Sequence, residues 1–412
     1  MRSDLERLMS EYNLDAIVVL SDETPNTFRD YLTGRAKARG NIFKKRGEQA
    51  VIVVSGMEVD EAAKSGLRVM TYHDFDFAAL YDQFGDQPTR LRRELFLNYF
   101  RKLDIRGRVG FYGTAAISNL LPNLLALTED DLGITLALDE DALSLFSHMY
   151  ETKDSAEIAA LQETARLTCE VVRRAWDFLS SHYASADAVG SPVVDETGAP
   201  LTIGAVRRFI QAQEAALGLV DAQGFIFAQG RDAGVPHSVG EDEQVLEVGR
   251  SIVFDIFPQG RNGYYHDMTR TWCLGRAAED VQAAHDQVMT AFRMVMDALA
   301  VGEPTSRYQI MVLDYFEANG HATQRSQPGT MEGYVHSLGH GIGLNIHEAP
   351  TFGEKSKHTL QIGNAFTVEP GLYYPERGFG VRVEDSVYID ESGVVQRLTD
   401  FPYDLVVPLR RR

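Results

Sequence analysis

The sequence predicts an α+β protein in which a smaller N-terminal α/β domain precedes a larger α+β domain. Its 412 residues exceed the ~100–200 residues of a typical single domain. Short apolar runs alternate with helical periodicity in the first third, which indicates an α/β arrangement. A strand-like pattern covers residues 223–275 and returns from residue 363 onward, after two helical segments. We place the boundary near residue 150, so that the domains comprise residues 1–149 and 150–412.

The N-terminal domain is expected to alternate amphipathic helices with buried strands. Apolar residues at helical spacing predict helices, and short continuous apolar runs predict strands buried on both faces. The expected helices cover residues 3–13, 74–83 and 88–103, and the expected strands cover residues 16–20, 50–54 and 109–112.

The larger domain begins with helical periodicity over residues 141–178 and continues through a polar stretch, 180–202, that predicts a loop. Thr202 is expected to cap a helix with apolar residues at 206, 209, 210 and 217. The remaining pattern predicts strands over 224–227, 251–257 and 264–274, helices over 279–300 and 305–319, and β structure over 363–409.

The bulk composition limits the classes of partner. A net charge of -19 disfavours binding to nucleic acid or to an anionic membrane. The two cysteines, Cys169 and Cys273, allow no disulfide framework, and the charged N-terminus lacks the apolar region of a signal peptide. We therefore expect a cytoplasmic protein with reduced thiols.

Two aspartates flank a predicted turn. Asp255 lies in an otherwise apolar strand, where an ionised carboxylate is costly unless it is paired or bound to a metal. Residues 259–263 predict a turn between this strand and Asp267. In a hairpin centred on Arg261, Asp255 would lie opposite Asp267 with the Cβ atoms ~5 Å apart, which favours a cation between them. The alternative is one hydrogen-bonded aspartate and one that flanks the turn.

Three histidines, His336, His340 and His347, fall within residues 335–350, where Gly339 and Gly341 enclose His340. A lone histidine is usually structural, but three among closely spaced glycines favour a site that approaches the backbone closely.

Two glutamates lie inside apolar, strand-like runs. Glu369 follows Phe-Thr-Val, and Glu384 follows Val-Arg-Val. Buried glutamates need partners, so each is either one half of an ion pair or a metal ligand. In a strand, Arg382 would share a face with Glu384, whereas Asp385 would point to the other face.

The order Asp255, Asp267, His340, Glu369, Glu384 resembles that of the pita-bread metallopeptidases, the family of methionine aminopeptidase, aminopeptidase P and prolidase. The motifs Asp-Met-Thr-Arg-Thr, Gly-His-Gly-Ile-Gly, Val-Glu-Pro-Gly and Arg-Val-Glu-Asp are all present. The resemblance covers roughly residues 150–408, and residues 1–145 more weakly resemble the creatinase-type N-terminal domain. The interval between the two aspartates is one residue longer than the common family pattern, which implies a larger turn or a bulge.

The resemblance implies two bound divalent metal ions, with Mn²⁺ first and Co²⁺ or Zn²⁺ as alternatives on ligand softness. Asp255 would ligate one ion, Asp267 and Glu384 would bridge both, and His340 and Glu369 would hold the other. Glu369 would also be the general base.

Four further residues would complete the site. By the same resemblance, His237 would position the substrate, His347 would contact the scissile amide, and His336 would line the site. Arg382 would either orient a ligand or bind a substrate carboxylate.

The implied activity is hydrolysis of short peptides next to proline by a homodimer. An Xaa-Pro dipeptidase (prolidase) is the first hypothesis, and an Xaa-Pro aminopeptidase that accepts longer peptides is the second. A third is a binding module of the same fold without metal, which the survival of all five ligand types disfavours.

Overall fold

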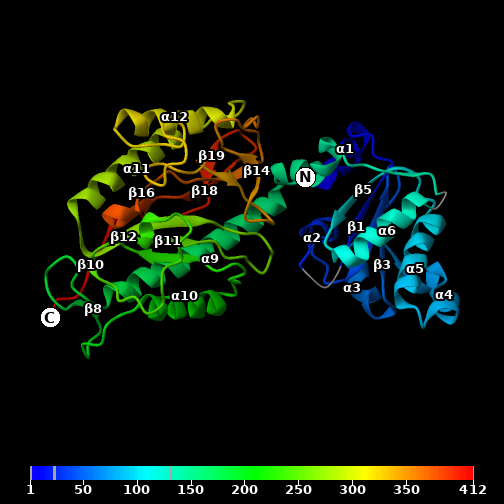
Figure 1. Cartoon of the computed structure of the whole chain (residues 1–412), viewed down its shortest axis with the longest axis horizontal. Coiled ribbons are helices and arrows are strands. Elements are labelled where there is room, and N and C mark those ends of the chain that lie inside the picture. Colours follow the sequence, from blue (N-terminus) through cyan, green and yellow to red (C-terminus); the bar gives the residue numbers. More distant parts are fainter. Residues whose placement is uncertain (1, 22–24, 130–131, 412) are drawn as a thin grey trace. The chain divides into compact units, whose positions relative to one another are not determined.

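The structure is a computed structural model that describes residues 2–21, 25–129 and 132–411. The chain forms two compact units, Met1–Met149 and Tyr150–Arg412 (Figure 1). Helices and strands occur in both units, and the predicted mixed α and β fold is confirmed.

A mixed six-stranded sheet lies at the centre of the smaller unit. Its strands are β1 (Ala16–Leu20), β2 (Gly40–Lys45), β3 (Val51–Val54), β4 (Arg68–Thr71), β5 (Gly107–Gly113) and β6 (Ile134–Leu136). They lie in the order β4-β3-β2-β1-β5-β6, with β1 parallel to β5 and antiparallel to β2. Every residue of β1 is buried, as its continuous apolar run predicts.

The helices of the smaller unit are α1 (Leu5–Glu11), α2 (Thr27–Thr33), α3 (Val59–Ala63), α4 (Phe77–Phe84), α5 (Pro88–Leu103), α6 (Ile117–Glu129), α7 (Glu140–Leu143) and α8 (Leu145–Glu151). The predicted helix 88–103 is confirmed as α5, which starts with a proline that needs no backbone partner there. Strands β2, β4 and β6 were not predicted, because none of them contains more than two consecutive apolar residues.

The larger unit contains two main sheets. The first has the order β10-β12-β11-β9, with β20 also paired to β12, and the second has the order β14-β13-β15-β18-β19. The bounds are β9 (Ile226–Gln229), β10 (Val248–Gly249), β11 (Ser251–Ile256), β12 (Met268–Ala277), β13 (His340–Gly341), β14 (Glu348–Thr351), β15 (Ala365–Val368), β18 (Asp385–Ile389), β19 (Val395–Arg397) and β20 (Val406–Val407). Two hairpins complete the set, β7 (Tyr183–Ala184) with β8 (Val193–Val194) and β16 (Gly371–Tyr374) with β17 (Phe379–Arg382).

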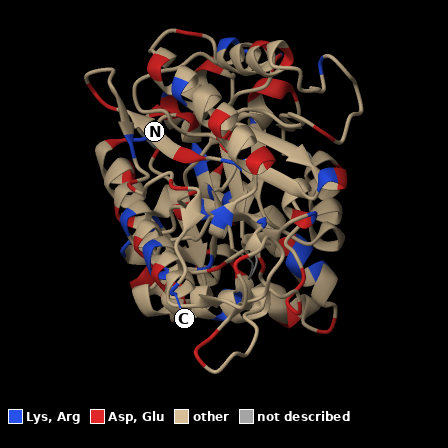
Figure 2. Ribbon diagram, turned by 90° about the vertical axis from the view of Figure 1, so that its left-hand side faces the viewer, with Lys and Arg blue, Asp and Glu red and all other residues tan. Residues whose placement is uncertain are grey.

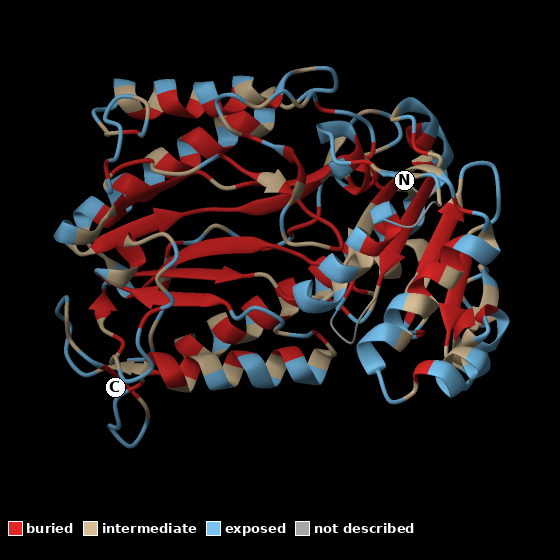
Figure 3. Cartoon of the chain, turned by 45° about the vertical axis from the view of Figure 1, so that its right-hand side comes forward, coloured by how far each residue is buried: buried red, intermediate tan, exposed pale blue. Residues whose placement is uncertain are grey.

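Four long helices cover these sheets. They are α9 (Ser155–Ser180), α10 (Ile203–Leu217), α11 (Glu279–Ala298) and α12 (Thr305–Ala318). Apolar residues of α9 and α10 pack with β11 and β12, whereas those of α11 and α12 pack with β15 and β17. Figure 3 shows the consequence, since the strands are buried and the outward faces of the helices are exposed. The predicted Thr202 cap is confirmed, because its side chain accepts a hydrogen bond from the Ala205 N–H.

The two main sheets meet beside the strand that follows the aspartate turn. Thr269 of β12 forms an antiparallel bridge with Glu384, which lies between β17 and β18. Thr271, two residues further along β12, exchanges hydrogen bonds with the backbone of Arg382 at 2.9 Å each way. These contacts fix strand β12 of the first sheet against residues 382–384, the segment that carries Glu384.

The expected register of the aspartate hairpin is wrong by two residues. Asp255 lies opposite Thr269, not opposite Asp267. The turn is centred on Asn262, whose side-chain oxygen accepts the Tyr264 N–H at 3.0 Å. Because side chains alternate with period 2, a shift of two residues keeps both aspartates on the same face.

The same register shows where the extra residue between Asp255 and Asp267 is accommodated. The ladder of β11 and β12 and the isolated bridge between Gln259 and Tyr265 share one register, so no bulge separates them. The register therefore favours the larger turn over the bulge. A strand over 264–274 was also expected, but β12 begins only at Met268, which leaves Asp267 at its entrance.

Acidic and basic residues are interspersed around the larger unit (Figure 2). In the part of the chain that the structure describes, no helix combines the length and the apolar character needed to cross a membrane.

One buried acid lies on the inner face of α10. Glu214 is 2% exposed, and its Oε2 has no hydrogen-bond partner within the described residues. Burial, followed by the negative charge of Asp221, raises the pKa of Glu214 from 4.5 to about 8. The folded protein therefore binds a proton in this pH range that the unfolded chain releases.

We expect this group to make the larger unit less stable as pH rises from about 4.5 to about 8, because across that window the folded protein keeps a proton that the unfolded chain releases. Glu214→Gln should remove the decline, so its melting temperature relative to the wild type should increase with pH. Calorimetry across this range measures the difference. Glu196→Gln, at an exposed position, is the control. A constant difference at all pH values would contradict the assignment.

Candidate active site

The five predicted ligands come from separate elements of the larger unit. Asp255 belongs to β11, Asp267 precedes β12, and His340 begins β13. Glu369 directly follows β15, and Glu384 precedes β18. Strands and their ends therefore supply all five, which gives each side chain a backbone fixed by a ladder or lying next to one.

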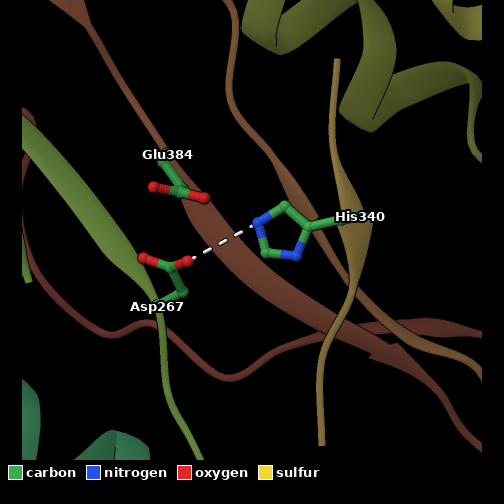
Figure 4. A group of neighbouring side chains, drawn as sticks. All are labelled: Asp267, His340 and Glu384. Carbon is green, nitrogen blue, oxygen red and sulfur yellow. Dashed lines mark ion pairs between the residues drawn. The ribbon is translucent and has the colours of Figure 1, made fainter. Parts of the chain in front are cut away.

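The side chains of three of these residues gather at one point (Figure 4). Asp267, His340 and Glu384 each offer one ligand atom, and these atoms lie within 4.8 Å of one another. His340 Nε2 is also 3.6 Å from Asp267 Oδ2 and 3.6 Å from Glu369 Oε1. The group can therefore hold a metal ion.

Burial and the crowding of negative charge set the electrostatics of the site. Burial, followed by the charges of Glu384 and Asp255, raises the pKa of Asp267 well above its usual range. Burial and then Glu384 do the same to the pKa of Glu369. Burial and then Asp255 raise the pKa of Glu384 to about 8. Each of these carboxylates is thus destabilised in its charged form by its neighbours.

Three carboxylate oxygens test whether metal ions fit here. Asp255 Oδ1, Asp267 Oδ1 and Glu384 Oε1 are fully buried, and none has a hydrogen-bond partner among the described residues. An unpaired buried polar atom costs about 1–3 kcal/mol, and more when it is charged. Divalent cations bound among these carboxylates would satisfy such oxygens, and an oxygen-rich set with one imidazole suits Mn²⁺ or a similar ion. The donor set therefore fits.

His340 has the tautomer that a ligand needs. Its Nδ1–H donates to the Gly341 carbonyl at 3.1 Å, which leaves the lone pair on Nε2 toward the carboxylates. Burial, followed by the nearby His347, lowers the pKa of His340 to about 4, so the ring is neutral. Gly339 lets the strand approach closely, because a Cβ there would lie 2.0 Å from the Thr367 carbonyl oxygen.

Arg382 is fully enclosed by partners within the site. Its Nη2 donates to Asp255 Oδ2, and its Nε donates to Thr269 Oγ1 at 3.1 Å. Its Nη1 donates to the Tyr373 hydroxyl at 2.8 Å and to the Pro236 carbonyl at 3.3 Å. Of the two predicted roles, these contacts favour orientation of Asp255 over binding of a substrate carboxylate.

The predicted histidines lie around this centre. The His347 ring meets the His340 ring edge-on, with centroids 4.3 Å apart. His336 donates from Nδ1 to the Ser337 carbonyl at 2.7 Å and accepts from the Tyr373 hydroxyl at 2.9 Å. His237 is exposed and lies close enough to His336 and His347 to lower the pKa of both.

Comparison with known proteins now decides the family. The model of metallopeptidase family M24 matches residues 159–391, more than half of the chain. The chain belongs to metallopeptidase family M24.

Relatives of this M24 member extend over nearly its whole length. It is 28% identical to "Probable dipeptidase PepE" of Mycobacterium tuberculosis over 371 residues, 89% of this chain and 84% of that protein. The structure of an Xaa-Pro dipeptidase from Bacillus anthracis is similar with a TM-score of 0.77 and 23% identity, covering 99% of each chain.

An X-Pro aminopeptidase from Thermotoga maritima is also similar, with a TM-score of 0.73 and 20% identity over 97% of this chain and 99% of that one. At these identities the structural likenesses show the fold alone. That fold is the two-domain pita-bread architecture, as the sequence predicts.

Sequence reasoning missed two residues of this M24 site. Thr269 donates to Glu384 Oε2 at 2.8 Å and also receives the Arg382 contact. Tyr373 links Arg382 to His336. Thr269 could have been found from its spacing, since it lies two residues beyond Asp267 and so shares its face. Nothing in the sequence near Tyr373 marks it, because its neighbours are apolar.

We expect Asp267→Asn and Glu384→Gln to weaken Mn²⁺ binding by on the order of 100-fold or more, because each removes a buried charge that faces the cation. Isothermal titration calorimetry on chelator-treated protein measures this affinity. Glu391→Gln, an exposed glutamate near Glu384 in sequence, should bind Mn²⁺ like the wild type. Unchanged affinity in both site variants would remove these residues from the metal-binding set.

Proposed function

We propose that this chain is a dinuclear-metal peptidase that cleaves Xaa-Pro dipeptides. The observation that carries this proposal is the convergence of Asp267, His340 and Glu384, with Asp255 close enough to raise the pKa of two of them. Asp255, Asp267 and Glu384 each bury an oxygen that has no hydrogen-bond partner among the described residues. Membership of family M24 and relatives named as dipeptidases support the same reading. Mn²⁺ is the proposed ion, with Co²⁺ and Zn²⁺ as alternatives.

In the proposed arrangement Asp255, Asp267, His340, Glu369 and Glu384 would together hold the two ions. Bound divalent ions would polarise a carbonyl oxygen and lower the pKa of water. The carboxylates and the Nε2 lone pair of His340 would supply the ligand atoms for such ions.

The protein groups supply the proton transfers and the orientation. Glu369 accepts a proton from the attacking water and delivers it to the proline nitrogen as the C–N bond breaks. Its Oε1 lies 3.6 Å from His340 Nε2, at the edge of the carboxylate group.

The histidines line the substrate side of the centre. Burial, followed by His237, lowers the pKa of His347, so this imidazole is neutral and can donate a hydrogen bond to the scissile amide. His237, which lies close to both His336 and His347, is proposed to position the substrate, and His336 is proposed to line the site. Cytoplasmic location and a homodimer are part of the same proposal.

Arg382 supports the second candidate, an Xaa-Pro aminopeptidase. A dipeptidase benefits from a cation that recognises the free carboxylate of the C-terminal proline. Arg382 instead directs its donors to Asp255, Thr269, Tyr373 and Pro236. An enzyme that accepts longer peptides has no need for such a contact, so substrate length is the decisive measurement.

We expect a panel of Xaa-Pro dipeptides and Xaa-Pro-Xaa tripeptides, assayed with Mn²⁺, Co²⁺ or Zn²⁺, to show kcat/KM at least about 10-fold higher for dipeptides. That ratio corresponds to about 1.4 kcal/mol of additional transition-state binding. Chelation should abolish both activities. Cleavage of tripeptides alone would establish the aminopeptidase, and an inactive protein without metal affinity would establish a binding module.

We expect His347→Ala to lower kcat by about 10²-fold, because the variant loses a donor to the scissile amide. Metal content should stay at the wild-type level when measured by elemental analysis of the same preparation. Loss of metal in this variant would instead place His347 among the ligands.

A further inference from the structure

A buried ion pair lies next to the candidate histidine. Lys153 Nζ is 2.8 Å from Glu348 Oε2, and each side chain is 2% exposed. The two residues are 195 positions apart, and Lys153 also donates to the Tyr150 carbonyl at 2.6 Å. Burying two charges carries a desolvation cost that often exceeds the attraction between them, so stability alone is a weak reason for such a pair.

The Glu348 carboxylate organises the loop of residues 343–348. Its Oε1 accepts the Asn345 backbone N–H at 2.9 Å and the Asn345 side-chain amide at 3.1 Å. Gly343 lies against the same carboxylate, because a Cβ there would be 2.3 Å from Glu348 Oε2. The loop is therefore wrapped around one charged group, and any other residue at 343 would displace it.

This loop carries His347, the residue directly before Glu348. The ring of His347 meets that of His340, and His340 faces Asp267 and Glu369. A shift of the loop would therefore move His347 relative to the metal-binding group.

Lys153 is anchored independently of this loop. Its backbone N–H donates to the Gly363 carbonyl at 2.7 Å, and a Cβ on Gly363 would lie 2.9 Å from the Lys153 carbonyl oxygen. Residue 363 precedes β15, the strand that leads to Glu369. The Lys153 backbone is therefore fixed next to the strand that leads to Glu369.

We propose that Lys153 and Glu348 are positioning residues, a buried charge pair that holds the 343–348 loop so that His347 is aimed at the substrate. This inference rests on the proposed function for the role of His347. Among the described residues, the side-chain hydrogen bonds of the pair reach Tyr150 and Asn345 and no predicted metal ligand, so we place its action in the loop. Sequence reasoning assigned no function to either residue.

The test is a double-mutant cycle between Lys153→Met and His347→Ala. Lys153→Met keeps the aliphatic stem and removes the charge, so we expect kcat to fall about 10- to 100-fold, the scale of a misplaced catalytic group. In the His347→Ala background, Lys153→Met should change kcat less than about 2-fold, because there is no imidazole left to misplace. Equal losses in both backgrounds, or wild-type kcat in Lys153→Met, would overturn the proposal.

A second readout does not depend on turnover. In protein labelled at histidine, the His347 ring resonances, assigned by their absence in His347→Ala, should shift in Lys153→Met, while those of His148 in the smaller unit stay in place. Unshifted His347 resonances would overturn the proposal. If the wild type hydrolyses no proline peptide, the proposed function fails, and this spectrum alone decides the positioning role.

Two further variants guard against misfolding and non-specific effects. Glu348→Gln removes the charge but keeps an oxygen for Asn345, and it should reproduce both effects if Lys153→Met does not fold. Lys64→Met removes the lysine of the exposed pair with Glu61, so it should leave kcat and the histidine spectrum unchanged. An equal effect of Lys64→Met would overturn the assignment to the buried pair.

Discussion

The mutual repulsion of four carboxylates is the constraint on which the larger unit depends. Burial, together with neighbouring carboxylates that include Asp255, raises the proton affinity of Asp267, Glu369 and Glu384. Asp255, Asp267 and Glu384 each bury an oxygen that meets no donor in the described chain. A single arginine, Arg382, offsets part of this charge. Such a group is unfavourable as a core and favourable as a cage for cations, which explains why strands rather than loops hold it.

The surrounding polar network follows from that constraint. Thr269 bonds Glu384 and Arg382 together, so the arginine and the carboxylate keep their places without pairing directly. Behind them, Arg270 donates to the Glu384 carbonyl and forms a buried ion pair with Asp385 at 2.9 Å. Asp385 thus points away from the site and stabilises the backbone that presents Glu384. The adjacent residues Glu384 and Asp385 therefore point to opposite sides: Glu384 faces the site, and Asp385 pairs with Arg270 behind it.

The sequence predicted the parts of this arrangement that have a local cause. Charged residues inside apolar runs marked Asp255, Glu369 and Glu384, and the period of a strand placed Arg382 and Asp385 on different faces. The hairpin register escaped prediction because it depends on Asn262, whose amide donates to Ala160 of α9, a contact 102 residues away. Lys153 escaped for the same reason, since Glu348 lies 195 residues away in the sequence. Tyr373 escaped because nothing in its own apolar segment marks it.

The site also separates two mechanical tasks. The carboxylates stand on or directly beside strands whose ladders fix them, so the metal-binding geometry can be rigid. His237 and His347 stand on loops, and loops are where substrate preference can vary without disturbing that geometry. The 343–348 loop can hold the His347 ring in one orientation only if the loop itself is fixed to the rest of the domain. Glycines at positions 339 and 343 let backbone and carboxylate approach closely enough to fix it. The close packing at these two glycines therefore connects the strands that hold the carboxylates to the loop that carries His347.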